Sequence, residues 1–288
     1  MPVLSKILAP VAFSARCEGA VHYAEALACH FHSDLVLLHV VTPIPTYWAP
    51  DAVVMSPEVT DEAIEQSKAE LNRFAAEGLK GISVARVVEE GDPAQEIVQY
   101  AHNGNFDLIV MPTHGYGPFR RFLLGSVTAK VLHDASCPVW TGPHMEGAPD
   151  YPKISFRRVL CAVDLGSHSR AVLEWAAQFA REYGSDLDIV HAIPTSTVSV
   201  GGFYFDPEWR SQVENEARDR IAYLREGLGV KGEVRVETGE VAPAVRAVAE
   251  DTHADLVVIG RSHGGVLGRL RANAYAIVRD APCPVAAI

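Results

Sequence analysis

The chain has 288 residues, 48% of them hydrophobic, and a formal net charge of −11. This length suits two ordinary domains, and the apolar content is sufficient for a true core. The acidic balance argues against a nucleic-acid partner, because neutralising phosphates requires clustered Lys and Arg. No apolar run approaches the roughly 20 residues that a membrane-spanning helix needs, so no membrane partner is expected either.

The five cysteines form no C-x-x-C pair, and their number is odd. Both features favour a reducing, cytoplasmic location over a disulfide-stabilised secreted protein. The apolar stretch after Lys6 resembles a signal peptide only superficially, because Pro10 interrupts it and the same pattern recurs far downstream, where no signal can act.

Strand and helix patterns alternate through the first half of the chain. Short apolar runs of the buried-strand type predict strands at 7–11, 34–41, 82–88, 108–111 and 137–140. Between them, helices are predicted from Ser14 onward, over about 57–77, from Pro93 through His102, and up to Asp134. Pro93 suits a first helical position, because its fixed φ is compatible with a helix start.

The same pattern begins again after 141–153, a stretch with two glycines and three prolines but no periodicity. Four segments recur in the same order: 158–164 repeats 6–12, 185–191 repeats 33–39, 254–260 repeats 106–112, and 283–285 repeats 137–139. An internal duplication is therefore predicted, with domains at 1–142 and 155–288 and a linker at 143–154.

Strands that alternate with helices predict the α/β class, with an open doubly wound, five-stranded parallel sheet in each copy. The ligand crevice of such a sheet lies at the carboxyl ends of the strands, where the strand order reverses. Residues 10–14 are therefore expected opposite 112–126 in the first copy, and 162–167 opposite 260–272 in the second.

The main candidate site is the stretch 107–127. It combines an apolar run, a loop with Gly115, Gly117 and Pro118, and a helix start at Gly125-Ser126. The free backbone N–H groups at a helix start form an anion site. The chain contains no Gly-x-x-x-x-Gly-Lys-Ser/Thr phosphate loop.

Four motifs together resemble the universal stress protein family. They are Ile-Leu-Ala-Pro-Val-Ala-Phe-Ser at 7–14, Leu-Leu-His-Val-Val at 37–41, Met-Pro-Thr-His-Gly at 111–115 followed by Leu-Leu-Gly-Ser-Val at 123–127, and Cys-Pro-Val at 137–139. The chain looks like a tandem member, and the resemblance covers all of it except the linker. It implies a Rossmann-like (HUP) fold and an adenine-nucleotide-binding (ATP or AMP) regulatory or stress-response function.

In nucleotide-binding members, Gly-x-x-Gly, nine residues and Gly-Ser or Gly-Thr hold the phosphates, while an Asp after the first strand faces the nucleoside. For the first domain the resemblance implies contacts at Pro10, Val11, Val40, Val41, Met111, Gly115, Gly125, Ser126 and Val127. Nine residues do separate Gly115 from Gly125. However, Pro112 replaces the first glycine and has no N–H to donate, and Ala12 replaces the Asp.

For the second domain the resemblance implies contacts at Ala162, Asp164, Ile193, Gly260, Gly264, Arg269 and Arg271. Asp164 and Gly260 are present here, and Gly264 or Gly265 supplies the second glycine. The Gly-Ser position falls on Arg271-Ala272, and the loop is shorter; Arg269 and Arg271 would then hold phosphate by charge. Because each domain keeps a different part of the site, the alternative is an interaction or scaffold protein of the same fold with degraded sites.

Several candidates also have structural explanations. Ser126 suits an N-cap, and Asp164 with Ser167 suits the cap of the following helix. His39 and His191 are interpreted as histidines at a sheet edge. His114 and His263 are assigned to loop structure, because no further ligand lies at metal-binding spacing and no metal site is expected.

The expected ligand is ATP or AMP, with Mg²⁺ bridging phosphates. The chain offers no positioned base, nucleophile or metal cluster, so no catalysis beyond slow ATP hydrolysis is expected. The resemblance also implies a pseudo-dimer of the two domains within the chain, through their last strands (Val139-Trp140 and Val285-Ala286), and a homodimer of chains.

Overall fold

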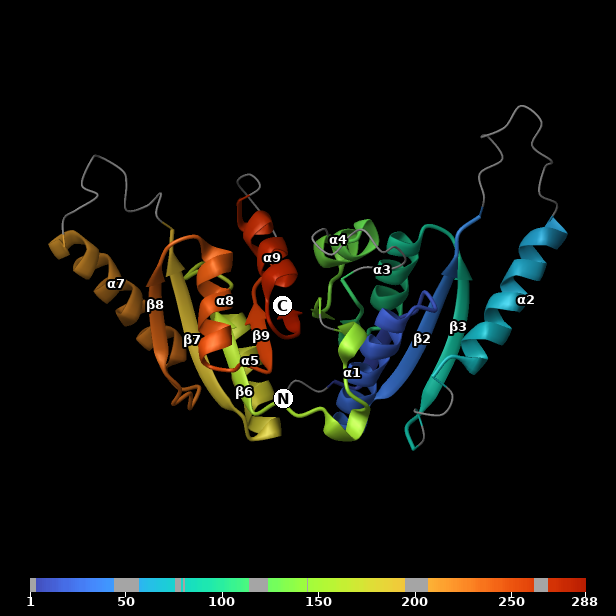
Figure 1. Ribbon diagram of the computed structural model, residues 1–288, viewed down its shortest axis with the longest axis horizontal. Helices are drawn as coiled ribbons and strands as arrows, with labels where there is room; N and C mark the ends of the chain where they lie inside the picture. The colour runs from blue at the N-terminus through green and yellow to red at the C-terminus, as the bar shows by residue number, and fades with distance from the viewer. Residues whose placement is uncertain are drawn as a thin grey trace, which may run out of the picture. The chain divides into compact units, whose positions relative to one another are not determined.

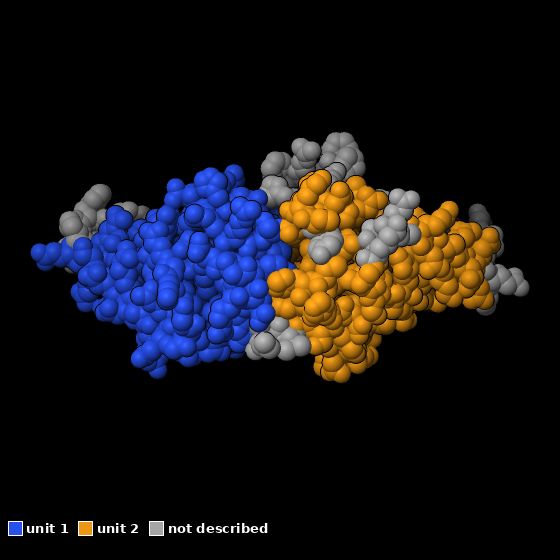
Figure 2. Space-filling model, turned by 90° about the horizontal axis from the view of Figure 1, so that it is seen from below, with its two compact units in different colours: residues 1–2, 141–144, 155–288 blue, residues 3–140, 145–154 orange. Residues whose placement is uncertain are grey.

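The computed structural model describes residues 4–43, 57–75, 79, 81–113, 124–143, 145–194, 207–261 and 269–288. Within these, the chain divides into two compact units (Figure 2). The first domain comprises 4–140 and 145–154, and the second comprises 141–143 and 155–288. Each is described by itself below.

The first domain is an open parallel sheet with helices on both of its faces (Figure 1). Its elements are β1 (Lys6–Pro10), α1 (Ala15–Phe31), β2 (Asp34–Val41), α2 (Pro57–Arg73), β3 (Val84–Glu90), α3 (Pro93–Asn103), β4 (Leu108–Val110), α4 (Ser126–Asp134) and β5 (Val139–Thr141). The strand order is β3-β2-β1-β4-β5, and every pair is parallel.

The second domain repeats this arrangement. Its elements are β6 (Arg158–Ala162), α5 (Ser169–Tyr183), β7 (Asp186–Ile193), α7 (Pro207–Arg225), β8 (Val234–Thr238), α8 (Val241–Asp251), β9 (Leu256–Ile259), α9 (Arg269–Asp280) and β10 (Val285–Ala287). The order β10-β9-β6-β7-β8, again all parallel, matches that of the first domain strand for strand. The predicted fold class is therefore confirmed.

The central strands form because their residues are apolar and can be buried on both faces, as in doubly covered parallel sheets. All three residues of β4 are buried, as are all four of β9. Two helices, α1 and α3, begin after a polar residue whose side chain accepts a hydrogen bond from an N–H group of the first turn. Ser14 accepts a hydrogen bond from the Cys17 N–H at the start of α1, and Asp92 accepts one from Gln95 N–H ahead of Pro93.

The duplication extends to individual hydrogen bonds at the amino ends of the strands. Asp107 Oδ2 accepts from the N–H groups of Ser5 and Lys6, and Asp255 Oδ2 accepts from those of Arg157 and Arg158. Each of these aspartates directly precedes the fourth strand of its domain, and its carboxylate binds the backbone at the start of the first strand.

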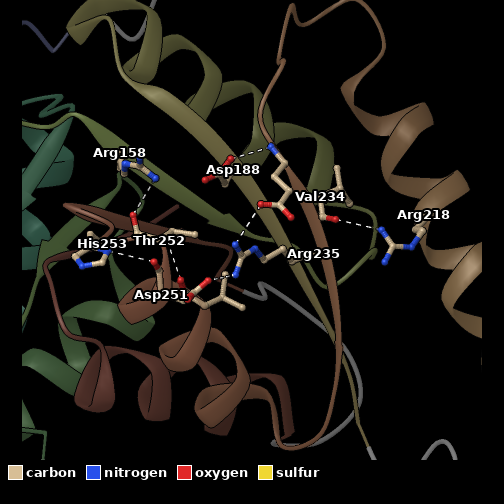
Figure 3. Close-up of polar contacts among 10 residues, drawn as sticks. Arg158, Asp188, Arg218, Val234, Arg235, Asp251, Thr252 and His253 are labelled. Carbon is tan, nitrogen blue, oxygen red and sulfur yellow. Dashed lines mark hydrogen bonds and ion pairs between the residues drawn. The ribbon is translucent and has the colours of Figure 1, made fainter.

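A wider polar network surrounds this end of the second sheet (Figure 3). Arg235 on β8 pairs with Glu233 and with Asp251 at the end of α8, and Arg158 Nη1 donates to the carbonyl of Thr252. Exposed ion pairs of this kind contribute about 0–1 kcal/mol each. Because the network lies at the amino ends of the strands, away from the expected crevice, we assign it to structure.

Several predicted boundaries differ from the structure. β3 begins at Val84 rather than at 82, and α2 ends at Arg73, two residues before Ala75 with its left-handed φ of 52°. A left-handed residue cannot continue a right-handed helix. Strand and helix ends are the features that sequence patterns locate least well, because neighbouring packing decides them.

The predicted linker contains ordered structure. Residues 145–154 form two short 3-10 turns, Met145–Gly147 and Tyr151–Lys153, and pack on α1 of the first domain. Met145 is only 1% exposed, which gives this stretch apolar burial that its glycines and prolines do not suggest. No helix within the described ranges is long and apolar enough to cross a membrane.

Candidate functional site

A cavity of about 350 Å³ lies at the carboxyl ends of the strands in the second domain. Its walls come from the ends of β6, β7 and β9, from the first turns of α5 and α8, and from the middle of α9. β6 lies between β7 and β9, so the cavity is at the point where strand order reverses. This is where doubly wound sheets bind ligands, and the volume is in the range of small-molecule sites.

The end of β6 supplies Asp164, an exposed residue of the cavity lining. Leu165 has a left-handed φ of 60°, and the resulting turn lets Asp164 Oδ1 accept from Gly166 N–H at 2.8 Å and from Ser169 Oγ at 2.7 Å. Within the described ranges, Oδ2 has no recorded protein partner. One carboxylate oxygen is thus fixed by the turn, while the other is available to a ligand donor.

Asp164 and Ser167 were expected to cap the following helix together, but Ser167 is not the serine that bonds to Asp164. The hydroxyl that meets Asp164 is that of Ser169, the first residue of α5. The N-cap position belongs to His168, which makes no side-chain capping bond. The left-handed turn moves the helix start two residues beyond Ser167, which local sequence could not reveal.

The end of β9 supplies Gly260 and Arg261, both in the cavity lining. A Cβ added to Gly260 would lie 3.1 Å from Cγ2 of Val172, so glycine keeps space between β9 and α5. Arg261 is only 8% exposed, and its N–H donates to the carbonyl of Ile288 at 2.7 Å. Sequence reasoning missed Arg261, although its place directly after Gly260 at the end of a buried strand was a usable signal.

His191 near the end of β7 also lines the cavity. Nδ1 lies 2.8 Å from the carbonyl oxygen of Val163, so Nδ1 carries the proton and donates it, as His39 does to Val11 at the same distance. Both histidines lie on inner strands, β7 and β2, and not at an edge of the sheet as expected. Burial lowers the pKa of His191, and the nearby Arg220 adds to this, against the opposing effects of Val163 O and Asp164.

This lowered pKa predicts a pH dependence of stability. A histidine that binds its proton more weakly when folded leaves the domain fully stable above its unfolded pKa, about 6.5, and less stable as the pH falls below that value. We expect the free energy of unfolding to decline less steeply from pH 7 to pH 5 in His191→Gln than in the wild type, measured by urea titration. His39→Gln, which removes the equivalent hydrogen bond in the first domain, is the matched control. Parallel wild-type and His191→Gln curves would contradict the assignment.

The other residues predicted for this domain lie in different places. Ala162 lines the cavity; Ile193 is buried but is not part of the lining, whereas its neighbours Ala192 and Pro194 are. Arg269 and Arg271 lie in the first turn of α9, and nothing is described of their side chains. Gly264 and His263 lie outside the described residues.

In the first domain the structure brings several predicted residues to one end of the sheet. Pro10 ends β1 and Val11 follows it, Met111 follows the neighbouring β4, and Val40 and Val41 end β2. Gly115 and His114 lie outside the described residues.

The helix start in the first domain differs from expectation. Gly125, and not Ser126, is the N-cap of α4, and no side chain caps the helix. Ser126 and Val127 are its first two residues, so their N–H groups are among those that a helix leaves unbonded. Gly125 N–H donates to Thr113 O, and Thr128 Oγ1 donates to Pro112 O at 3.0 Å, which ties both ends of the glycine loop together. Pro112 therefore contributes an acceptor where the family pattern has a donor.

The described residues contain no group of three side chains that could hold a metal ion. Burial raises the pKa of Cys161 on β6 to about 12, so this thiol stays protonated at neutral pH and is no nucleophile.

Comparisons with known proteins agree with this fold. The model of the universal stress protein family matches residues 4–141 and 155–288. A universal stress protein of Mycolicibacterium smegmatis is 28% identical over 97% of this chain and 95% of its own length, and universal stress protein A homolog 1 of Coxiella burnetii is 33% identical over 46% of this chain and 96% of its own. A universal stress protein of Archaeoglobus fulgidus has a similar crystal structure, with a TM-score of 0.70, 22% identity and coverage of 99% of this chain and 98% of that one.

Proposed function

The chain belongs to the universal stress protein family, and from this premise we propose that its second domain binds an adenine nucleotide, ATP or AMP, as a regulatory or stress-response module. The cavity at the carboxyl ends of β6, β7 and β9 is the observation that carries the proposal, because it joins Asp164, Gly260 and Arg261 at the strand-order reversal.

The lining divides into parts that suit the parts of a nucleotide. Ala162, Val190, Ile259 and Ile277 offer an apolar wall for a base. Asp164 Oδ2 offers a charged acceptor for ribose hydroxyls, a type of hydrogen bond worth about 1.5–3 kcal/mol. Gly260 leaves room for a ligand to approach the backbone closely.

Replacing Asp164 by alanine should weaken nucleotide binding. Losing a charged hydrogen bond to the ribose predicts a roughly ten- to hundredfold rise in Kd. Isothermal titration of the full chain measures it. Asp188→Ala is the matched control, because Asp188 also accepts one backbone hydrogen bond, from Glu233 N–H, but lies outside the cavity (Figure 3). Equal losses of affinity in the two variants would remove Asp164 from the site.

The proposal itself is tested on freshly purified protein, denatured so that any released small molecule can be identified by chromatography and mass. Adenine nucleotide near one per chain, or saturable binding of added AMP or ATP with Mg²⁺, would support it. An empty protein that binds neither would refute it and leave the scaffold function, which the Ala12 and Pro112 replacements in the first domain favour.

We also propose the finer features that accompany such a module. Mg²⁺ would bridge the phosphates when ATP is bound, the protein would reside in the cytoplasm, and chains would pair as homodimers. The odd number of cysteines and the lack of a C-x-x-C pair in the sequence agree with a reducing compartment. Size-exclusion chromatography with light scattering tests the dimer, and a mass of 31.2 kDa would contradict it.

A further inference from the structure

The turn after β6 has a backbone conformation that its own residues do not favour. Leu165 has a left-handed φ of 60°, which is sterically costly for a residue with a branched side chain. Such residues persist where the surrounding structure holds them, and they cluster at ligand sites. The preceding residue, Asp164, lines the cavity. The bonds that hold this turn therefore also determine where the carboxylate lies.

Ser169 holds the turn from the first residue of α5. This serine is only 2% exposed, and its Oγ donates to Asp164 Oδ1 at 2.7 Å. The N–H of Gly166 donates to the same oxygen at 2.8 Å. Two donors that approach one oxygen from different parts of the turn restrict the rotation of the carboxylate more than one donor does. The Ser169 hydroxyl thus helps to fix the orientation of Oδ2, the oxygen that is available to a ligand.

Arg220 holds the same turn from α7. Its Nη2 donates to the carbonyl oxygen of Leu165 at 2.7 Å, across 55 positions of the chain. Arg220 is not one of the lining residues that the structure describes for this cavity. The left-handed residue is therefore fixed through its carbonyl by one helix, while the carboxylate beside it is fixed by another.

The first domain has a left-handed residue at the same place but not the carboxylate and hydroxyl. Phe13 has a φ of 50°. The positions that match Asp164 and Ser169 hold Ala12 and Cys17, and the N–H of Ala12 donates to Cys17 Sγ at 3.3 Å. The turn itself is thus common to both domains, whereas the carboxylate occurs together with the hydroxyl that orients it.

From these bonds we propose that Ser169 and Arg220 are positioning residues for the nucleotide: they fix the turn so that Asp164 Oδ2 meets the ribose hydroxyls in a ready orientation. The proposal rests on the proposed function of the cavity and specifies how one part of the ligand is recognised. A preorganised acceptor binds more tightly, because no side chain has to be ordered when the ligand arrives. Loss of either residue should therefore weaken the part of the affinity that the ribose hydroxyls provide.

Titration of the full chain with AMP and with its 2′,3′-dideoxy analogue tests the proposal, because the analogue keeps the base and the phosphate but lacks both ribose hydroxyls. Ser169→Ala and Arg220→Gln should each raise the Kd for AMP roughly two- to tenfold, as expected for a side chain that must be ordered on binding. The Kd for the analogue should not change. Arg220→Gln also removes a charge that lowers the pKa of His191, but an effect of that charge would appear with both ligands, since their phosphates are the same.

A double-mutant cycle and two controls complete the design. In an Asp164→Ala background neither substitution should weaken AMP binding further, because the carboxylate that it orients is gone. Ser185→Ala and Arg218→Gln are the matched controls. Ser185 Oγ donates to Phe156 O, and Nη1 of Arg218, also on α7, donates to Val234 O (Figure 3); neither residue is among those described as lining the cavity. Both controls should bind AMP as tightly as the wild type does.

The outcomes separate the inference from the proposed function. Unchanged AMP affinity in both variants, equal weakening of AMP and its analogue, or losses that add fully to that of Asp164→Ala would overturn the inference while leaving the cavity an adenine-nucleotide site. If Ser169→Ala fails to fold, Arg220→Gln carries the test, because Arg220 is an exposed residue. Failure of AMP, its analogue and ATP to bind the wild type would refute the proposed function, and the inference with it.

Discussion

Replacing Phe179 by alanine is expected to lower the free energy of unfolding of the second domain by about 3–5 kcal/mol. Phe179 lies on α5 and is fully buried. Its ring stacks on Trp175 at a centroid distance of 5.4 Å, meets Phe156 edge-on at 5.4 Å, and lies 4.8 Å from Tyr183. Alanine would leave a cavity among three aromatic rings and remove their pairwise contacts, each worth about 0.5–1.5 kcal/mol.

Urea unfolding followed by circular dichroism, with hydrogen exchange to assign the transition to a domain, measures this loss. Tyr223→Ala is the control, because it also truncates an aromatic residue on a helix of the same domain, but Tyr223 is 71% exposed. Its expected effect is within about 0.5 kcal/mol of zero. If both variants cost the same, the aromatic cluster does not stabilise the domain as the packing indicates.

Replacing Gly19 by alanine is expected to displace residues 145–154 from α1. A Cβ at this position would lie 1.5 Å from the carbonyl oxygen of Met145, a distance that no side-chain rotation relieves. Overpacking typically destabilises a protein by about 1–3 kcal/mol. A clash this close would cost more than that if nothing moved, so the first domain is expected to relieve it by releasing residues 145–154. Release would expose Met145, which is 1% exposed, and break the contact between His22 Nδ1 and Ala148 O.

Limited proteolysis and hydrogen exchange over residues 145–154 would report that displacement, together with the loss of thermal stability. Gly147→Ala is a close control, because it makes the same substitution within the segment and its Cβ would meet nothing within 4 Å. Gly19→Ala should be cleaved faster than the wild type, and Gly147→Ala should not. Protection unchanged in Gly19→Ala would mean that the segment does not pack closely on α1.

The candidate site was only partly predictable from sequence. Ala162, Asp164 and Gly260 were predicted from family motifs, and the structure places all three around one cavity. Arg261 was not predicted, because arginine is exposed in most settings and local sequence does not show that tertiary packing buries this one. The partner of Asp164 was also missed, since Ser169 reaches it through the left-handed turn at Leu165.

The sequence by itself determined the duplicated α/β fold, the strand and helix order, and the helix starts after Ser14 and at Pro93. These features follow from local patterns, because apolar runs must be buried and polar side chains must bond nearby helix N–H groups. Tertiary structure alone decided the burial of Arg261, the ends of α2 and β3, and the packing of Met145 against Gly19. Each of these depends on contacts between residues far apart in the chain, whose energies no local pattern contains.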